Sequence, residues 1–234
     1  SAASDVYKRQ VYQYTLQAVK KLIDMGAPLT ILACNTASAK ALRTIQQNDL
    51  PRIDASLRVL GVIRPSVEAI GHFTKTKHVG IFGTPGTVNS ESYPIEIAKL
   101  WADVKVFQQS CPMWVPLVEN GEYDKEGADY FVKKYVDQLM AQSDKIDTII
   151  LACTHYPLLI DKIRQYLPPY MNILSQGDIV ALSLKDYLSR HVDIETKLSK
   201  GGTVSFYTTE NVDKFESTAR IFFDEEMSVN SISL

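Results

Sequence analysis

The sequence predicts an α/β fold in which two similar units, each built on a parallel sheet, are related by a pseudo-twofold axis, with the active site in the cleft between them. Short apolar segments alternate with amphipathic ones along the chain, which is typical of parallel sheets with helices on both faces. The segment "ILAC" at residues 31–34 returns as "ILAC" at 150–153, and an internal repeat indicates two similar units. Chance is the alternative, because these residues are common in buried strands.

The first quarter of the chain begins this alternation. Apolar side chains at three- and four-residue spacing predict a helix that starts at residue 11 and ends at Gly26. Strands are predicted at 29–33 and 58–63, with a helix at 37–47 between them. A further helix is opened by Pro65 and Ser66, because proline fits the first turn of a helix.

The remaining elements follow the same reasoning. Strands are predicted at 78–84, 104–108, 147–152, 172–176 and 203–208. Helices are predicted near 88–101, at 125–141, after Tyr156, at 178–190 and at 212–223, with a loop at 110–124. We expect residues 1–72 plus 176–234 to form one discontinuous domain and residues 73–175 to form the other.

Composition excludes several classes of function. With 234 residues and 45% hydrophobic content the chain is large enough for a substantial core. A net charge of −2 with scattered basic residues argues against a nucleic-acid partner. No apolar run approaches the roughly 20 residues of a membrane span, and no signal segment opens the chain. Three widely spaced cysteines are typical of free thiols in the cytoplasm rather than of a disulfide framework.

Each copy of the repeat places a cysteine where a strand ends and a helix begins. Ligands of parallel α/β sheets bind at this edge, and the start of a helix lowers the pKa of a thiol. If Cys34 and Cys153 face one ligand from opposite sides, one thiolate removes a proton from a carbon and the other thiol returns a proton to the opposite face. Such a reaction inverts a stereocentre, which makes the chain a racemase. The alternative is that each cysteine is only a small buried apolar residue.

Cofactors and metals are not expected at this site. The sequence contains no dinucleotide or phosphate-binding glycine motif and no identifiable Schiff-base lysine. A metal site made of Cys34, Cys153 and His155 is conceivable, but no pair of these residues has a recognisable zinc spacing. The pocket itself would then have to acidify the carbon, through hydrogen bonds to a substrate carboxylate and exclusion of water.

Several segments in register carry a family resemblance: "LACNTASA", "GVIRPSVEA", "GTPGTVNSESY", "CPMWVPLVENG" and "LACTHYPLL". Together they resemble the bacterial glutamate racemases of the aspartate/glutamate racemase family, which supply D-glutamate for peptidoglycan without a cofactor. The resemblance implies glutamate as substrate and a homodimer. It implies Cys34 and Cys153 as acid/base thiols, His155 as assistant of the second thiol, and Asn35, Thr36, Thr84, Thr87, Thr154 and Glu119 as substrate-contacting residues.

These assignments have plainer alternatives. A histidine two residues after Cys153 favours the thiolate when it is charged, but it also fits a helix cap or a cleft wall. Thr84 and Thr87 fit ordinary turn and N-cap chemistry equally well, and Glu119 fits a solvated loop. Cys111 has no partner pattern and is interpreted as structural.

The sequence also departs from the family pattern. An Asp-Ser-Gly turn after a first strand and a Pro-Tyr-Gly loop are absent, and the pattern begins only at residue 11. We therefore expect a chain that lacks its first βα unit and is weakly active or inactive. Smaller departures are Ser66, where the family commonly has glycine, and "SQGD" at 175–178. An aspartate or other acidic amino-acid racemase, or a non-catalytic binding fragment, are the alternative interpretations.

Overall fold

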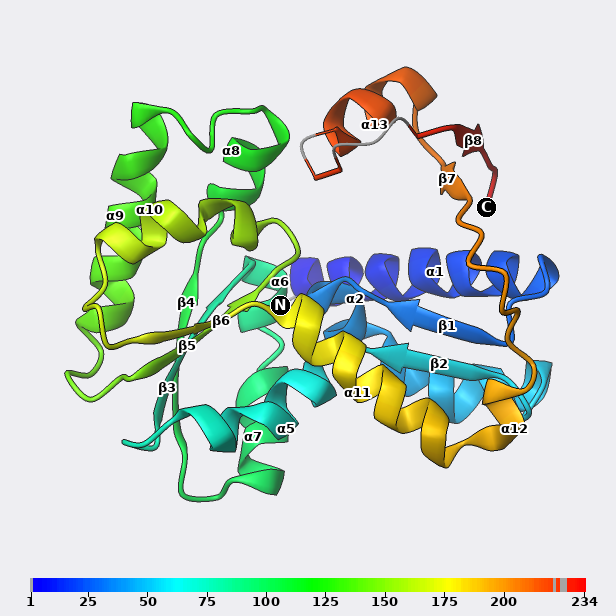
Figure 1. The fold of residues 1–234 in the computed structure, drawn as a ribbon, viewed down its shortest axis with the longest axis horizontal. Helices are drawn as coiled ribbons and strands as arrows, with labels where there is room; N and C mark the ends of the chain where they lie inside the picture. The colour runs from blue at the N-terminus through cyan, green and yellow to red at the C-terminus, as the bar shows by residue number, and fades with distance from the viewer. Residues whose placement is uncertain (1, 221, 224–226) are drawn as a thin grey trace.

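Within the residues that the structure describes, the strands form three separate sheets, and every strand pair is parallel (Figure 1). The computed structural model describes residues 2–220, 222–223 and 227–234, except for the side chains of residues 2–4. The strands are β1 (Leu29–Leu32) beside β2 (Arg58–Gly61), the four-stranded sheet β4 (Lys105–Ser110), β3 (His78–Gly83), β5 (Thr148–Ala152) and β6 (Asn172–Leu174), and β7 (Phe206–Thr208) beside β8 (Val229–Ser231). The predicted α/β fold with parallel sheets is confirmed.

The four-stranded sheet is buried on both faces. Side chains alternate along each strand, so Phe82 and Leu151 join one hydrophobic cluster while Ile81 and Ile150 join another. The first cluster is completed by helices α8 (Trp114–Glu119), α9 (Glu126–Met140) and α10 (Ile160–Gln165), and the second by α5 (Ile63–Phe73) and α7 (Ser92–Leu100). All five residues of β5 are buried, and after Thr148 its sequence is a continuous apolar run, as burial on both faces favours.

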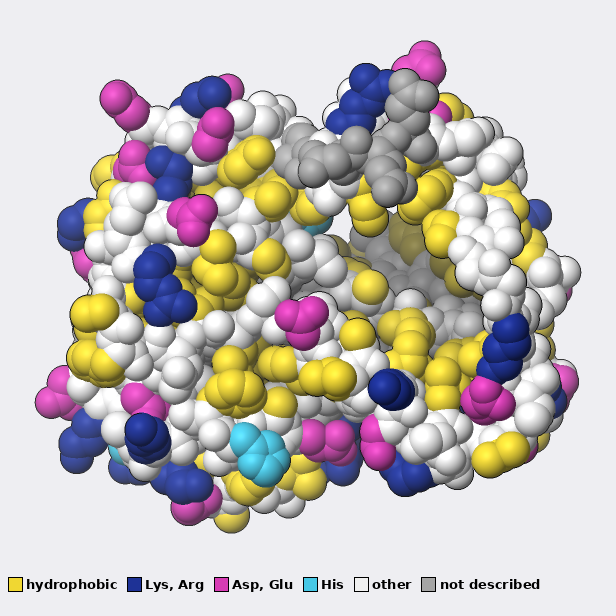
Figure 2. All heavy atoms as spheres, in the orientation of Figure 1, with side chains coloured by type: hydrophobic (Ala, Val, Ile, Leu, Met, Phe, Trp, Pro, Cys, Tyr) yellow, Lys and Arg dark blue, Asp and Glu magenta, His cyan; other side chains and the backbone are white. Residues whose placement is uncertain are grey.

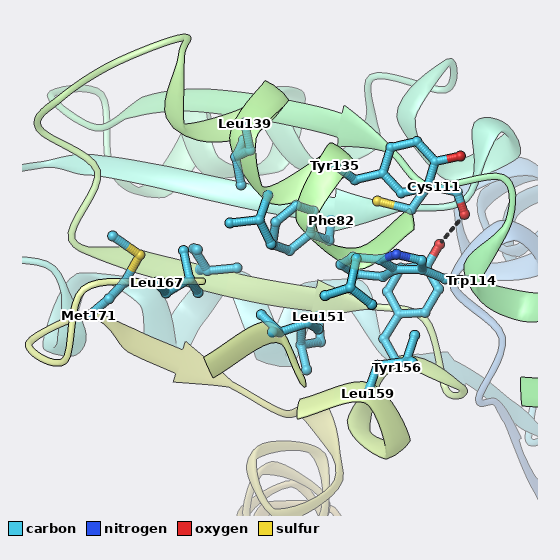
Figure 3. Close-up of a cluster of buried hydrophobic side chains, with 14 of the residues drawn as sticks. Phe82, Cys111, Trp114, Tyr135, Leu139, Leu151, Tyr156, Leu159, Leu167 and Met171 are labelled. Atoms are coloured by element: carbon cyan, nitrogen blue, oxygen red, sulfur yellow. Dashed lines mark hydrogen bonds between the residues drawn. The ribbon is translucent and has the colours of Figure 1, made fainter. Parts of the chain in front are cut away.

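Trp114 lies in the first cluster beside the other aromatic side chains (Figure 3). Its ring centroid lies 4.8 Å from those of both Phe82 and Tyr156 and 6.0 Å from that of Tyr135. The loop predicted at 110–124 is therefore wrong, because Trp114 and Val118, four residues apart, form one apolar helix face that packs into this core. The helix ends at Glu119, one of the predicted site residues.

The two-stranded sheet β1–β2 has a smaller core of its own. Helix α1 (Ala2–Asp24) contributes Val19, and the connection between the strands contributes Ala41, Ile45 and Leu50. The helix starts nine residues before its predicted start, because residues 5–10 are exposed and show no apolar period that would reveal it.

The helix predicted at 37–47 is broken into short pieces. They are α2 (Asn35–Lys40), α3 (Leu42–Thr44), the π-helical turn η1 (Ile45–Asp49) and α4 (Leu50–Ile53). The wide π turn places residues five apart over one another. Ile45 and Leu50 are thereby both buried on the β1–β2 core.

The other predicted elements are present with shifted limits. The helix expected at 88–101 is divided into α6 (Pro85–Val88) and α7, while α11 (Gln176–Arg190) is followed by a short α12 (Val192–Glu195). The strand predicted at 203–208 is only β7, and β8 was not predicted. The helix predicted at 212–223 is α13 (Val212–Ala219), and residue 221 lies outside the described residues.

In the view of Figure 1 the C-terminal segment of β7, α13 and β8 lies above α1. Figure 2 shows that the molecular surface is hollowed beside this segment and that hydrophobic side chains border the hollow. Within the described residues, no helix is both long and apolar enough to span a membrane.

Candidate active site

Each of the two repeated cysteines ends a strand, as predicted. Cys34 follows β1 and is the N-cap residue of α2, and its thiol is exposed. Cys153 follows β5 and precedes the 3₁₀ turn η2 (Tyr156–Leu159), and it is half-buried. Because Gly83 is the register partner of Ala152, the residues that follow them, Thr84 and Cys153, leave the sheet side by side.

Three threonine hydroxyls join the Cys34 turn to the end of β3. The Oγ1 atom of Thr36 lies 3.0 Å from that of Thr84 and 3.2 Å from that of Thr87, and the latter two are 3.2 Å apart. The approach is close because Gly86 lacks a side chain: a Cβ atom there would lie 2.9 Å from the Thr36 methyl group. The start of α2 therefore meets the end of β3, which is next to Cys153.

The environment of Cys153 opposes ionisation. Burial raises its pKa to about 11, against partial compensation by the backbone N–H groups of His155 and Tyr156. The charges of Cys34 and Glu119 raise the pKa of Cys153 further. The expected lowering of the thiol pKa is therefore wrong for Cys153, because desolvation outweighs the few N–H groups of a short 3₁₀ turn.

A chain of polar contacts runs from Glu119 to Cys153. The Nε2 atom of His155 lies 3.2 Å from a carboxylate oxygen of Glu119, and its Nδ1 atom lies 3.8 Å from the Cys153 sulfur. The hydroxyl of Thr154, an exposed residue, lies 3.3 Å from the same Nδ1. Since an ionised carboxylate only accepts hydrogen bonds, it favours a proton on Nε2 and leaves the Nδ1 lone pair for the thiol.

The aromatic ring of Phe222 covers part of this histidine. The centroids of the Phe222 and His155 rings are 5.8 Å apart and the rings are nearly perpendicular, an arrangement that aromatic pairs prefer. Phe222 comes from the C-terminal segment, and no site role was predicted for it. Nothing in its local sequence pattern distinguishes it from an ordinary apolar residue.

Asn35 is placed differently from the other predicted residues. It is only 3% exposed, and its carboxamide accepts a hydrogen bond from the Tyr93 hydroxyl (2.7 Å) and donates one to the Gln176 carboxamide (2.6 Å). Gln176 in turn donates to the Ser66 hydroxyl (2.6 Å). The sequence analysis did not assign Tyr93, Gln176 or Ser66 to the site, although Ser66 and the "SQGD" segment were noted as departures from the family pattern.

The remaining features lie away from this site or are structural. Cys111 is fully buried in the Trp114 cluster, and burial raises the pKa of its thiol, which fits the structural interpretation. Among the described residues no group of three acidic, histidine or cysteine side chains is arranged to hold a metal ion. A cavity of about 660 Å³ opens between β2, α5, α7 and α11, and neither Cys34 nor Cys153 lines it.

Comparison with known proteins is consistent with a racemase site. Residues 1–176 match the family described as Asp/Glu/Hydantoin racemase. The chain is 34% identical over 228 residues to a glutamate racemase of Persephonella marina, and the match covers 97% of this chain and 81% of that relative. It is 37% identical over 228 residues to a glutamate racemase of Ruegeria sp., with 93% and 81% covered.

Solved structures give the same family. The fold is similar to the crystal structure of a glutamate racemase isoform from Bacillus anthracis, with a TM-score of 0.86, 30% identity, and 97% of this chain and 82% of that chain covered. It is also similar to a glutamate racemase from Francisella tularensis in complex with D-glutamate, with a TM-score of 0.83, 27% identity, and 97% and 81% covered.

Proposed function

The chain belongs to the Asp/Glu/hydantoin racemase family, a family of amino-acid racemases, and from this premise we propose that it interconverts L- and D-glutamate without a cofactor. The observation that carries the proposal is the contact of Thr36 with Thr84 and Thr87, which brings the Cys34 turn to the strand end beside Cys153. The relatives named above support glutamate as the substrate, because both are glutamate racemases and one similar structure contains D-glutamate.

In the proposed reaction one sulfur acts as base and the other as acid. A thiolate takes the α-proton, so that the Cα–H bond breaks and an S–H bond forms, and the electron pair stays on the α-carbon. The opposite thiol then gives its proton to the other face, which forms a new Cα–H bond and leaves a thiolate. Each turnover exchanges the protonation states of Cys34 and Cys153, so the same site works in both directions.

Neighbouring side chains would support these steps. When Cys153 acts as base, His155 is the group that accepts its proton, and Glu119 would stabilise the resulting imidazolium. The hydroxyls of Thr36, Thr84 and Thr87, with Thr154 and Asn35, are the proposed contacts for the substrate's carboxylate and ammonium groups. Exclusion of water between the two units would strengthen these contacts.

The architecture of the proposed site follows from the two larger sheets. We propose that residues 1–72 plus 176–234 and residues 73–175 are the two related domains and that glutamate binds in a cleft between them. We further propose that the enzyme works in the cytoplasm as a homodimer and supplies D-glutamate for peptidoglycan. Multi-angle light scattering tests the dimer directly.

The test of the activity is exchange at the α-carbon. In deuterated solvent the chain should incorporate deuterium into both enantiomers of glutamate and racemise each. Cys34→Ser and Cys153→Ser should each abolish racemisation, whereas Cys111→Ser is the matched control and should retain it. Faster racemisation of aspartate than of glutamate contradicts the proposal. Undiminished racemisation by Cys34→Ser or by Cys153→Ser also contradicts it, and so does binding of glutamate without exchange at the α-carbon.

A further inference from the structure

A closed ring of hydrogen bonds includes Asn35, the residue that follows Cys34. The Tyr93 hydroxyl donates to Asn35 (2.7 Å), Asn35 donates to Gln176 (2.6 Å), and Gln176 donates back to the Tyr93 oxygen (2.9 Å). The second N–H of Gln176 is directed to Ser66 at 2.6 Å, and the Ser66 hydroxyl donates to the Val62 carbonyl at 2.8 Å. Gln176 Nε2 also lies 3.3 Å from the Val62 carbonyl oxygen, so its two N–H groups are shared among three acceptors. Each carboxamide oxygen accepts from one ring member while its nitrogen donates to the next, which fixes the orientation of Asn35 and Gln176.

The ring is buried except at Gln176, which is half-buried, so the bonds in it are costly to lose. Tyr93 is fully buried, Ser66 is 1% exposed and Asn35 is 3% exposed. A buried polar group without a partner loses its hydration without compensation, and hydrogen bonds in a chain polarise and strengthen one another. Removal of a single member should therefore disturb the whole ring rather than one contact.

Gln176 is the member that joins separate parts of the molecule. It is the first residue of α11, and it contacts Asn35 at the start of α2, Ser66 on α5 and Tyr93 on α7. Asn35 comes between Cys34, the proposed base, and Thr36, which binds the threonine pair at the end of β3. Gln176 thus links this short turn to α5, α7 and α11.

We propose that Gln176 is a positioning residue for the racemisation: through the ring it holds Asn35, and with it the Cys34 turn, in the geometry that the reaction uses. This inference rests on the proposed function. The chemistry demands glutamine, because the side chain both accepts from Asn35 and donates to Tyr93 and Ser66. Glutamate cannot donate when ionised, and methionine offers neither a donor nor a strong acceptor.

The test compares Gln176→Met and Gln176→Glu with Gln165→Met, a matched control at an exposed position at the end of α10. For a positioning role, we expect Gln176→Met to raise KM for glutamate or lower kcat roughly tenfold per folded molecule, because its hydrogen bonds to Asn35, Ser66 and Tyr93 are lost. Gln165→Met should change neither. Combined with Tyr93→Phe, the effect should be smaller than the product of the two single effects, because both variants break the same ring. Unchanged kinetics in folded Gln176→Met and Gln176→Glu, or effects that multiply, overturn the proposal.

A readout independent of activity separates this proposal from the proposed function. The Ser38 N–H donates to the Cys34 carbonyl at 2.9 Å and closes the first turn of α2. Amide hydrogen exchange at Ser38 should be at least tenfold faster in Gln176→Met than in Gln165→Met if the ring holds this turn. Equal exchange overturns the positioning role. If the unmodified chain fails to racemise glutamate, the proposed function is lost, but the exchange result still decides whether the ring holds the turn.

Discussion

The unusual environment of Cys153 leads to a quantitative prediction about its reactivity. With a pKa of about 11 in place of the ordinary 9.0, roughly one molecule in a thousand carries the thiolate at pH 8, against roughly one in ten for an ordinary thiol. A thiolate of higher pKa is a stronger nucleophile by about six- to tenfold for a rise of this size. Cys153 should therefore be alkylated at pH 8 roughly ten times more slowly than an unperturbed cysteine.

The pH dependence of alkylation is the decisive measurement. Brief iodoacetamide labelling from pH 7 to 11.5, with site-resolved peptide mass spectrometry, gives the rate at Cys153 separately from the rates at the other cysteines. The rate should still be rising about tenfold per pH unit at pH 9, and Glu119→Gln should move the inflection to lower pH because the carboxylate charge raises this pKa. A plateau at or below pH 9 refutes the argument that desolvation dominates at this thiol.

Two further predictions concern packing and pH. Gly86→Ala places a Cβ 2.9 Å from the Thr36 methyl group and should lower the free energy of unfolding by about 1–3 kcal/mol in urea titrations. Gly127→Ala, where no atom lies within 4 Å of the added Cβ, should be neutral or slightly stabilising. Burial opposes ionisation of Asp147, but hydrogen bonds from Thr74 and two backbone N–H groups outweigh burial and lower the pKa of this carboxyl. The ionised carboxylate therefore stabilises the folded chain at pH values above the ordinary pKa of 3.8. This contribution to the free energy of unfolding is lost as the pH falls through the lower pKa of the folded state. Asp147→Asn should accordingly be less stable than the unmodified chain at pH 7, with the difference vanishing in acid.

The parts of the fold that the sequence predicts are those with a strong local pattern. Strand β5 is buried along its whole length, and its sequence is apolar at every position except the first, Thr148. Helix α8 is different, because Pro112, Pro116 and Gly121 are typical of a loop. Tertiary burial of Trp114 outweighs these local preferences, and contacts of this kind are not visible in a short window of sequence.

The same distinction between local patterns and long-range contacts applies to the candidate site. Residues beside the two cysteines could be proposed because the repeat and the family resemblance both mark them. The ring could not, since its members are far apart in sequence: Asn35 is separated from Tyr93 by 58 residues and from Gln176 by 141. The pKa of Cys153 was mispredicted for a related reason, because the start of a helix is a local feature whereas desolvation depends on how the whole domain packs around the sulfur.

The two cysteines of the repeat therefore lie in different environments. Cys34 is exposed and opens an α-helix, while Cys153 is half-buried and opens a 3₁₀ turn. Under the proposed reaction one thiol must carry a proton while the other lacks one, and the raised pKa of Cys153 favours the protonated form of that sulfur. Cys153 is therefore suited to act first as the acid, opposite a thiolate at Cys34. The opposite direction requires a proton on Cys34 and none on Cys153, and each turnover in the first direction leaves this state behind. Otherwise Cys153 must give its proton to Nδ1 of His155 while Cys34 takes one from solvent. Since L- and D-glutamate have equal free energy, kcat/KM must be the same in both directions, and the asymmetry of the thiols is confined to the separate values of kcat and KM.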